Sequence, residues 1–313
     1  VLLVKGDIAA ITANGPISAS GDLLKVDYDG ALNTSATGGN YGVGQSSGTE
    51  ISPASADTTV QGVRIMKAYP VFTKLTVPSN TLTTRTGMTL YRFKVDAVGG
   101  DVRIAKFTFN VSSTTGPTGT TGATTTKYSL YAYPNSDFTG NDGFSSTGLV
   151  NAAQCYGNGL DGNSATVANT VGLGAAYGQI EIFPDTAATV CGTGHSTTTY
   201  KVPANTSRWF DFQADVASVE SVSGTESFTV TLKGDAAFPV GHQTDGDTGE
   251  MSRANDQTGG EISVDSDTND DFIWSPSSTS SVSSIFDFDF TNGYQVSGLP
   301  SSDMPVETFT SGN

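Results

Sequence analysis

The sequence has very little of the side-chain chemistry on which most enzymes depend. Its 313 residues include two histidines and two cysteines, and 15 Lys and Arg stand against 31 Asp and Glu. The formal net charge of -16 repels phosphate groups, which disfavours binding to nucleic acid or to an anionic lipid surface. No apolar run approaches the length of a membrane span, and the apolar opening of residues 1–4 is too short for one. We therefore expect no nucleic-acid partner and no membrane span.

Two short motifs match catalytic signatures but lack the context that these signatures need. Residues 44–48 match G-x-S-x-G, yet they lie in a Gly/Ser loop without a buried strand before it or a helix after it. Residues 157–162 match G-x-G-x-x-G, but no helix start follows to bind a phosphate. His195 and His242, the two possible imidazole bases, lie in Gly/Thr-rich loops. We predict that the protein is not an enzyme, and the paired carboxylates of a glycosidase stay open as an alternative.

Several features fit a secreted protein. The chain begins with Val1 rather than Met, as a product does whose signal peptide has been removed. Cys155 and Cys191 flank a Gly-rich stretch, where one disulfide would suit an oxidising compartment, with two unpaired thiols as the alternative. Three asparagines begin the N-x-[ST] pattern of N-glycosylation acceptors, which also arises by chance in such a chain: Asn33, Asn110 and Asn205. We expect an extracellular or cell-surface location.

Alternation of apolar and polar residues with a period of two is the dominant local pattern. Residues 92–97 alternate charged and apolar side chains, which predicts a strand with one face toward a core. The apolar positions then change parity between Ile104 and Phe107, which predicts a β-bulge near Ala105. Residues 98–101, Val-Gly-Gly-Asp, have the turn chemistry of a hairpin between these two strands.

The same pattern recurs along the chain. Further strands are expected at residues 63–68, 71–76, 128–133, 179–183, 208–216, 227–233, 261–264 and 285–290. No segment shows a sustained apolar stripe of period 3.6, so we expect little helix. Short strands separated by Gly, Asn, Asp and Thr turns predict an all-β protein, an antiparallel β-sandwich of jelly-roll or immunoglobulin-like topology with long loops.

The ends of the chain differ from its centre. Residues 1–55 contain too little apolar surface for a core of their own and are expected to form an extended arm. The sandwich would occupy residues 56–300, with long insertions at 112–126 and 135–199. A polar C-terminal tail follows at residues 301–313, and the polar stretch from residue 297 onward would normally fray.

An acidic loop is the best candidate for binding an ion. Residues 265–271 place oxygen ligands at alternate positions, as the start of an EF-hand loop does, and hard cations prefer such ligands. Asp270 stands at the EF-hand glycine position and Pro276 at that of the bidentate Glu, so the EF-hand interpretation fails. A looser calcium site stays open at this loop, with the candidate ligands Asp265, Asp267, Asn269 and Asp271, and a weaker second site at Asp245, Asp247 and Glu250. The alternative is a solvated acidic surface, and we expect no other cofactor.

Two parts of the sequence resemble a known family. Residues 271–276, D-F-I-W-S-P, followed by a Ser-rich spacer and residues 289–300, D-F-T-N-G-Y-Q-V-S-G-L-P, resemble a recurrent ending of large secreted surface proteins of uncultured candidate-phyla bacteria. Residues 63–70 and 90–95 resemble the same family. The resemblance implies β-rich extracellular proteins, pilus-like or surface-layer-like, and brings no catalytic residues. Residues 299–302 depart from the L-P-x-T-G sorting signal, so covalent wall anchoring of that kind is not supported.

The first segment of the arm is the most distinctive candidate for function. Its apolar residues are Val1, Leu2, Leu3, Val4, Ile8 and Ile11. An apolar strand without a local core can complete the open edge of a neighbouring sandwich. The sequence therefore predicts a structural subunit of an extracellular homopolymer, a pilus-like filament assembled by donor-strand exchange with copies of itself.

Two alternatives stay open. One is a surface-layer protein, because head-to-tail contacts form a filament or a layer according to the angle between subunits. The other is an adhesin or carbohydrate-binding module that binds host-surface glycans, with Tyr128, Tyr131 and Tyr133 as a stacking face. Cross-strand pairing on a half-exposed sheet is the simpler account of these tyrosines.

Overall fold

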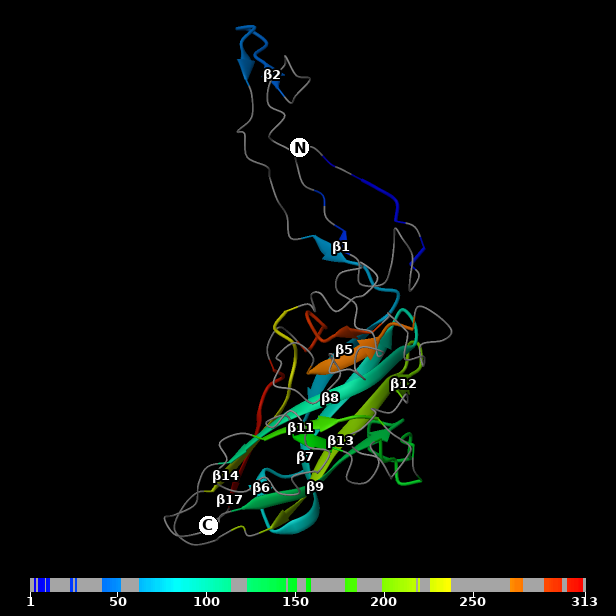
Figure 1. The fold of residues 1–313 in the computed structure, drawn as a ribbon, viewed down its shortest axis with the longest axis vertical. Coiled ribbons are helices and arrows are strands. Elements are labelled where there is room, and N and C mark those ends of the chain that lie inside the picture. Colours follow the sequence, from blue (N-terminus) through cyan, green and yellow to red (C-terminus); the bar gives the residue numbers. More distant parts are fainter. Residues whose placement is uncertain are drawn as a thin grey trace. The chain divides into compact units, whose positions relative to one another are not determined.

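The computed structural model describes most of the predicted sandwich and parts of the arm. The described residues are 3, 5–8, 10–11, 23–24, 26, 41–51, 62–113, 123–144, 146–150, 156–158, 178–184, 199–217, 219, 226–237, 271–277, 290–299 and 303–311. Throughout this part of the chain the regular structure is β-strand (Figure 1). No helix in it has the length and hydropathy to cross a membrane. The prediction of an all-β fold is confirmed.

The chain divides into two compact units, one of residues 1–20 with 66–313 and one of residues 21–65. The smaller unit contains two short antiparallel sheets: β1 (Leu23–Leu24) with β4 (Val63–Arg64), and β2 (Gly42–Val43) with β3 (Glu50–Ile51). Residues 44–48 connect β2 to β3, with the Gly48 N–H donating to the Gly44 carbonyl oxygen at 2.8 Å. The G-x-S-x-G motif is thus a hairpin turn and not a strand-to-helix elbow.

The larger unit contains a four-stranded antiparallel sheet. Its order is β5 (Tyr69–Leu75), β7 (Arg85–Val98), β13 (Ser207–Ala217) and β9 (Thr124–Tyr133). Each of these strands contains a segment of apolar and polar alternation, so one face of the sheet is apolar and the other polar.

The second sheet of this unit is built around β8 (Val102–Ser113). Two shorter strands share each edge of β8: β12 (Tyr200–Val202) and β11 (Gly178–Ile182) on one edge, β15 (Phe272–Ser275) and β14 (Ser227–Leu232) on the other. The sheet continues with β10 (Tyr156–Asn158), β16 (Thr291–Asn292), β17 (Glu307–Ser311) and β6 (Thr81–Leu82). Pairing between the described strands is antiparallel, apart from β17 with β6.

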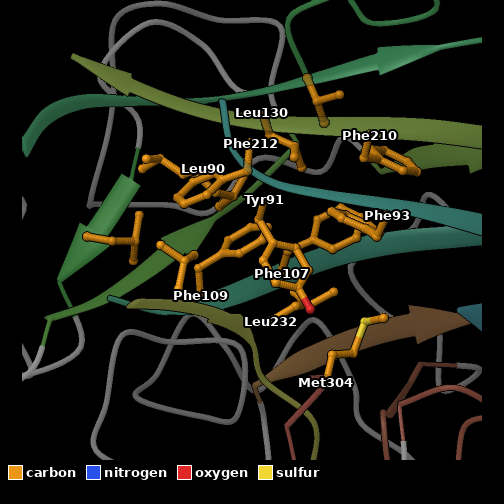
Figure 2. Close-up of a cluster of buried hydrophobic side chains, with 14 of the residues drawn as sticks. Leu90, Tyr91, Phe93, Phe107, Phe109, Leu130, Phe210, Phe212, Leu232 and Met304 are labelled. Carbon is orange, nitrogen blue, oxygen red and sulfur yellow. The ribbon is translucent and has the colours of Figure 1, made fainter. Parts of the chain in front are cut away.

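The two sheets face each other across an aromatic core, which Figure 2 shows. The rings of Phe109 on β8 and Phe212 on β13 are stacked, with centroids 3.8 Å apart. Phe93 on β7 stacks on Phe210 at 4.9 Å, and Phe107 on β8 lies 5.5 Å from Phe210. All five side chains are fully buried. Burial of each ring is worth about 1.5–3 kcal/mol, so this cluster holds the two layers together. The predicted sandwich is confirmed.

The predicted β-bulge at Ala105 is confirmed. On β15, Ile273 pairs with Lys106 and the next residue, Trp274, pairs with Ile104. One residue of β8, Ala105, is therefore left over between the two pairs, and its side chain joins a small second cluster with Ile273 and Phe290. The change of parity lets apolar residues on both sides of the bulge reach the main core.

The predicted hairpin at residues 98–101 is wrong. β7 belongs to the four-stranded sheet and β8 to the other, so these residues form an arch that carries the chain between layers. Both strands present aromatic rows, which pack face to face rather than side by side. Gly99 has φ of +84°, and a Cβ there would lie 2.9 Å from the Lys67 carbonyl oxygen, so the arch requires glycine.

The expectation that the C-terminal stretch would fray is wrong for residues 303–311. β17 pairs with β14 on one side and with β6 on the other. Met304 and Phe309 are buried, and the Met304 N–H donates to the Leu232 carbonyl oxygen at 2.9 Å. Period-two alternation in β17 places Phe309 in the core although its neighbours are polar.

Of the other expected strands, 63–68 is reduced to β4, whereas five others are found with shifts of a few residues at their ends: β5, β9, β11, β13 and β14. The expected strand at 261–264 and residues 285–289 of the last one lie outside the described residues. The division into an arm at 1–55, a sandwich with insertions at 112–126 and 135–199, and a tail stays a prediction.

Candidate functional site

The candidate donor segment exposes its apolar side chains. Leu3 is 71 % exposed and Ile8 is 52 % exposed, whereas Ile11 is partly buried. Val1, Leu2 and Val4 lie outside the described residues. The described residues up to Ile11 belong to no strand. This segment therefore carries apolar surface that the single chain does not cover.

Exposed large apolar side chains of the described residues are concentrated before residue 66. Eight lie there: Leu3, Ile8, Leu24, Val26, Tyr41, Val43, Ile51 and Val63. Three lie after it: Tyr69, Phe144 and Val306. Single exposed apolar residues are ordinary, but such an uneven distribution is typical of a segment that contacts a partner.

The two-sheet sandwich after residue 66, by contrast, buries its own core. The apolar residues on the inner faces of β7, β8 and β13 are 0–3 % exposed. The outer edge of β5 is partly covered as well, since the Phe72 N–H donates to the Ser297 carbonyl oxygen at 2.8 Å. Among the described residues the sandwich therefore has a filled core, and a neighbouring chain would meet its edges and outer surfaces.

The three tyrosines do not share one face, so their interpretation as a joint stacking surface is wrong. Tyr128 is fully buried, its ring lies 5.6 Å from that of Phe212, and its hydroxyl contacts that of Thr125. An irregularity at Lys127, where φ is +55°, separates Tyr128 from the pattern of the residues that follow. Tyr131 and Tyr133 lie on the other face of β9 and are partly buried.

The outer face of the four-stranded sheet nevertheless gathers aromatic side chains. Trp209 on β13, which sequence reasoning did not single out, is the direct cross-strand partner of Tyr133. The ring of Phe138 meets that of Tyr133 edge-on at 5.5 Å and covers the Arg92 guanidinium at 3.8 Å. Burial raises the pKa of Tyr133, with the nearby Asp211 charge as a second cause.

A buried polar network lies under these rings. The Asp211 carboxylate is 3 % exposed and accepts hydrogen bonds from Arg92 at 3.0 Å, Gln213 at 3.0 Å and Thr89 at 3.2 Å. Arg92 and Asp211 are direct cross-strand partners on β7 and β13. Because a buried carboxylate needs such donors, this network fixes the charged side chains of the sheet's outer face.

Two further lysine–carboxylate pairs are buried beside the other sheet. Lys106 on β8 lies 2.9 Å from Glu181 on β11, and both side chains are almost fully buried, at 1 % and 2 % exposure. Lys233, directly after β14, lies 2.8 Å from Asp271, directly before β15, at 12 % and 4 % exposure. Neither lysine stands out in the sequence, because a single Lys in an alternating strand resembles an ordinary solvated position.

Asp235 connects three separate chain segments at this place. Its carboxylate accepts the backbone N–H groups of Asp271 at 2.8 Å, Phe272 at 3.3 Å and Gly293 at 2.6 Å. Burial, together with the Asp271 charge, raises the pKa of Asp235 to about 7 against the effect of these hydrogen bonds. A Cβ at Gly293 would lie 2.8 Å from the Asp235 carboxylate oxygen, so a larger residue there would displace this carboxylate.

The candidate calcium ligands are largely outside the described residues: Asp245, Asp247, Glu250, Asp265, Asp267 and Asn269. Asp271 is described, and it is the ion-pair partner of Lys233. Within the described ranges, His, Cys, Asp and Glu form no group of three that could hold a metal ion. Calcium binding by the acidic loop stays a prediction.

The candidate disulfide and glycosylation residues lie partly within and partly outside the described residues. Cys155, Cys191 and Asn33 lie outside the described residues, so the disulfide and the first glycosylation acceptor stay predictions. Asn110 lies within β8 between β11 and β14 and is partly buried. Asn205 is exposed in a turn with φ of +56°, so it is the more accessible of the two described acceptors.

Comparisons with known proteins show no family for the chain. No protein-family model matches it, and no curated protein matches it. A structure reported as "Complete structure of manganese lipoxygenase of Gaeumannomyces graminis and partial structure of zonadhesin of Komagataella pastoris" aligns at 10 % identity and a TM-score of 0.20, over 60 % of this chain and 46 % of its own. Another, reported as "AvmM Catalyzes Macrocyclization in Alchivemycin A Biosynthesis", aligns at 10 % identity and a TM-score of 0.27, over 81 % and 94 %. The chain thus spans less than half of the first structure, and likenesses this weak carry no functional argument.

Proposed function

We propose that the protein is an extracellular structural subunit that assembles with copies of itself through its N-terminal apolar segment. The observation that supports this most is the contrast in burial between Leu3 and Ile8, 71 % and 52 % exposed, and a sandwich core at 0–3 %. Covering a Leu or Ile side chain is worth about 1.5–3 kcal/mol. A neighbouring copy that covers both residues gains this free energy at every contact along a polymer.

Strand addition at a sheet edge is the mode of docking that fits this segment. An extended segment can pair its backbone with an edge strand while alternate side chains fill surface pockets. Because the described core is already filled, the donated strand would extend a sheet rather than replace a missing core strand. Successive copies joined in this way form a filament or a layer according to the rotation between neighbours.

The test compares the wild type with a variant whose segment is polar. The double variant Leu3→Gln, Ile8→Gln keeps the net charge, and Val306→Gln, at a residue that is 55 % exposed in the larger unit, is the matched control. Sedimentation velocity over a range of concentrations, with negative-stain microscopy, measures the assembly. We expect the wild type and the control to form polymers and the double variant to remain a single chain.

Two outcomes would contradict the proposal. One is a wild type that stays a single chain at high concentration. The other is a double variant that polymerises as the wild type does, which would show that assembly uses another surface.

Glycan binding is a second candidate function, favoured by the direct pairing of Trp209 with Tyr133 on the outer sheet face. Sugar rings stack on aromatic faces. Tyr131, two residues before Tyr133 on the same face of β9, extends the row of aromatic side chains. A glycan array should then show signals that Trp209→Ala abolishes and that Tyr41→Ala, at a 49 % exposed aromatic residue elsewhere, retains. An array without signal for the wild type excludes this candidate and leaves self-assembly untouched.

A further inference from the structure

We propose that Lys233 and Asp271 form a covalent cross-link, an isopeptide bond between the lysine side-chain nitrogen and the aspartate side-chain carbonyl carbon. The Lys233 Nζ lies 2.8 Å from Asp271 Oδ2, and the two side chains are only 12 % and 4 % exposed. The amine nitrogen and the carboxyl group that it would attack are thus held in hydrogen-bond contact where little water reaches them. Fixed proximity of this kind corresponds to effective concentrations far above those in solution.

The reaction needs no other reactant. One proton passes from the Lys233 ammonium to the Asp271 carboxylate, which leaves a neutral amine beside a neutral carboxyl. The nitrogen lone pair then forms a bond to Cγ, the second proton moves from nitrogen to the departing hydroxyl, and the C–O bond breaks. One amide and one water molecule result, with no change of oxidation state.

The surroundings of Asp271 favour its protonated carboxyl. Burial raises the pKa of Asp271, while the charges of Lys233 and Lys106 act in the opposite direction. Asp303 is the nearby acid that adds to the increase. A neutral carboxyl is far more easily attacked than a carboxylate, so protonation of Asp271 makes its carboxyl carbon the better electrophile.

The backbone on both sides holds the two groups in place. The Lys233 N–H donates to the Thr108 carbonyl oxygen at 2.8 Å. Asp235 accepts the N–H groups of both Asp271 and Phe272. Asp235 is therefore a positioning residue, which aims the Asp271 side chain through its backbone.

Position in the chain distinguishes this pair from the others. Bond formation requires the nitrogen to approach the carboxyl carbon to about 1.33 Å, which rotation about the bonds of the long Lys233 side chain can supply. Lys233 and Asp271 lie at the ends of β14 and β15, and Lys233 keeps some exposure, whereas Lys106 and Glu181 lie within paired strands and are almost fully buried. The pair Lys201–Asp101 is solvent-exposed, at 44 % and 35 %, so water competes there.

Mass spectrometry of the intact, reduced and unfolded wild-type chain tests the proposal directly. We expect a mass lower than that of the sequence by one water, and a branched tryptic peptide that joins Lys233 to Asp271. Lys233→Arg keeps the charge but lacks the nucleophilic amine, so its mass should equal that of its sequence. A cyclised Asp-Gly succinimide also loses one water, but mild base hydrolyses it and Lys233→Arg retains it.

The result that overturns the proposal is a wild-type chain at full sequence mass, with Lys233 recovered in linear peptides. A branched peptide at Lys106–Glu181 with an unmodified Lys233 overturns the assignment of the residues. The wild-type measurement decides the question even if the variant fails to fold. Lys201 and Asp101 should appear in linear peptides in either case.

Discussion

Replacing Asp235 with Asn should change how the stability of the protein depends on pH. The raised pKa of about 7 means that the carboxyl keeps its proton in the folded chain under conditions where the unfolded chain, with a pKa near 3.8, has lost it. Below about pH 3.8 both states are protonated, and the contribution of this group to stability is complete. As the pH rises toward 7, folding must take up a proton, so the free energy of unfolding falls; above about 7 the loss is complete.

The size of this effect follows from the shift. A change from 3.8 to about 7 is roughly three pKa units, and each unit corresponds to about 1.4 kcal/mol, which gives about 4 kcal/mol while Asp271 is charged. A cross-linked Asp271 carries no charge, so burial alone would then raise the pKa and the effect would be smaller. Asn at position 235 is neutral like the protonated Asp, but its amide nitrogen cannot accept an N–H, whereas both oxygens of Asp235 do. Asp235→Asn should therefore lose a hydrogen bond at every pH. Relative to its difference from the wild type near pH 4, it should gain up to about 4 kcal/mol near pH 8.

Urea unfolding of both proteins, monitored by tryptophan fluorescence at several pH values, measures this difference. Asp137→Asn is the control, because the hydrogen bonds that Thr139 donates lower the pKa of this exposed carboxyl. This carboxyl therefore stays charged throughout the pH range in which Asp235 loses its proton. A difference between Asp235→Asn and wild type that is constant with pH would refute the reasoning. A change of the opposite sign would mean that the three backbone N–H donors outweigh burial and keep Asp235 charged.

Two further predictions concern packing. Gly298→Ala should lower the free energy of unfolding by several kcal/mol, because φ is +82° and the new Cβ would clash with the Phe72 carbonyl oxygen. Gly48→Ala is the control: φ is +65°, but a Cβ there would have nothing within 4 Å, so the cost should be only about 1 kcal/mol. Phe212→Ala, in the stacked core, should cost about 3–5 kcal/mol, against less than about 1 kcal/mol for Phe144→Ala at a 38 % exposed residue. Chemical denaturation checks both pairs, and equal costs within a pair would contradict the corresponding explanation.

Period-two alternation explains why the strands could be predicted from the sequence. Alternation depends only on which face of a strand is buried. It can still be followed across a bulge such as Ala105, where one extra residue exchanges the buried and exposed positions. The bulge could be predicted because Ile104 and Phe107 have opposite parity in the sequence and yet both reach the same core. The predictions failed where the pattern is short, as in β17, where Phe309 is the one large apolar residue of a polar segment.

Pairing between strands could not be predicted in the same way. Residues 98–101 have a composition that serves a hairpin and an arch equally well, and the choice depends on which faces meet in three dimensions. The buried charges were missed for a related reason. Lys233 and Asp271 are 38 positions apart in the numbering, and each alone resembles a solvated residue next to a strand. A buried ion pair becomes visible only when the fold brings its two partners together.

The two proposals can be separated because they use different parts of the chain. If self-assembly depends on Leu3 and Ile8, their replacement removes polymers, and the intact mass of the variant still lies one water below that of its own sequence. If Lys233 is cross-linked to Asp271, Lys233→Arg restores one water to the mass while the apolar segment can still dock on a neighbour. The cross-link would join the end of β14 to the start of β15 within one sandwich, so it would resist unfolding of each subunit without setting the affinity between subunits. A Lys233→Arg variant that assembles normally but unfolds at a lower urea concentration is therefore the expected combination, whereas loss of assembly in this variant would show that the two parts are coupled.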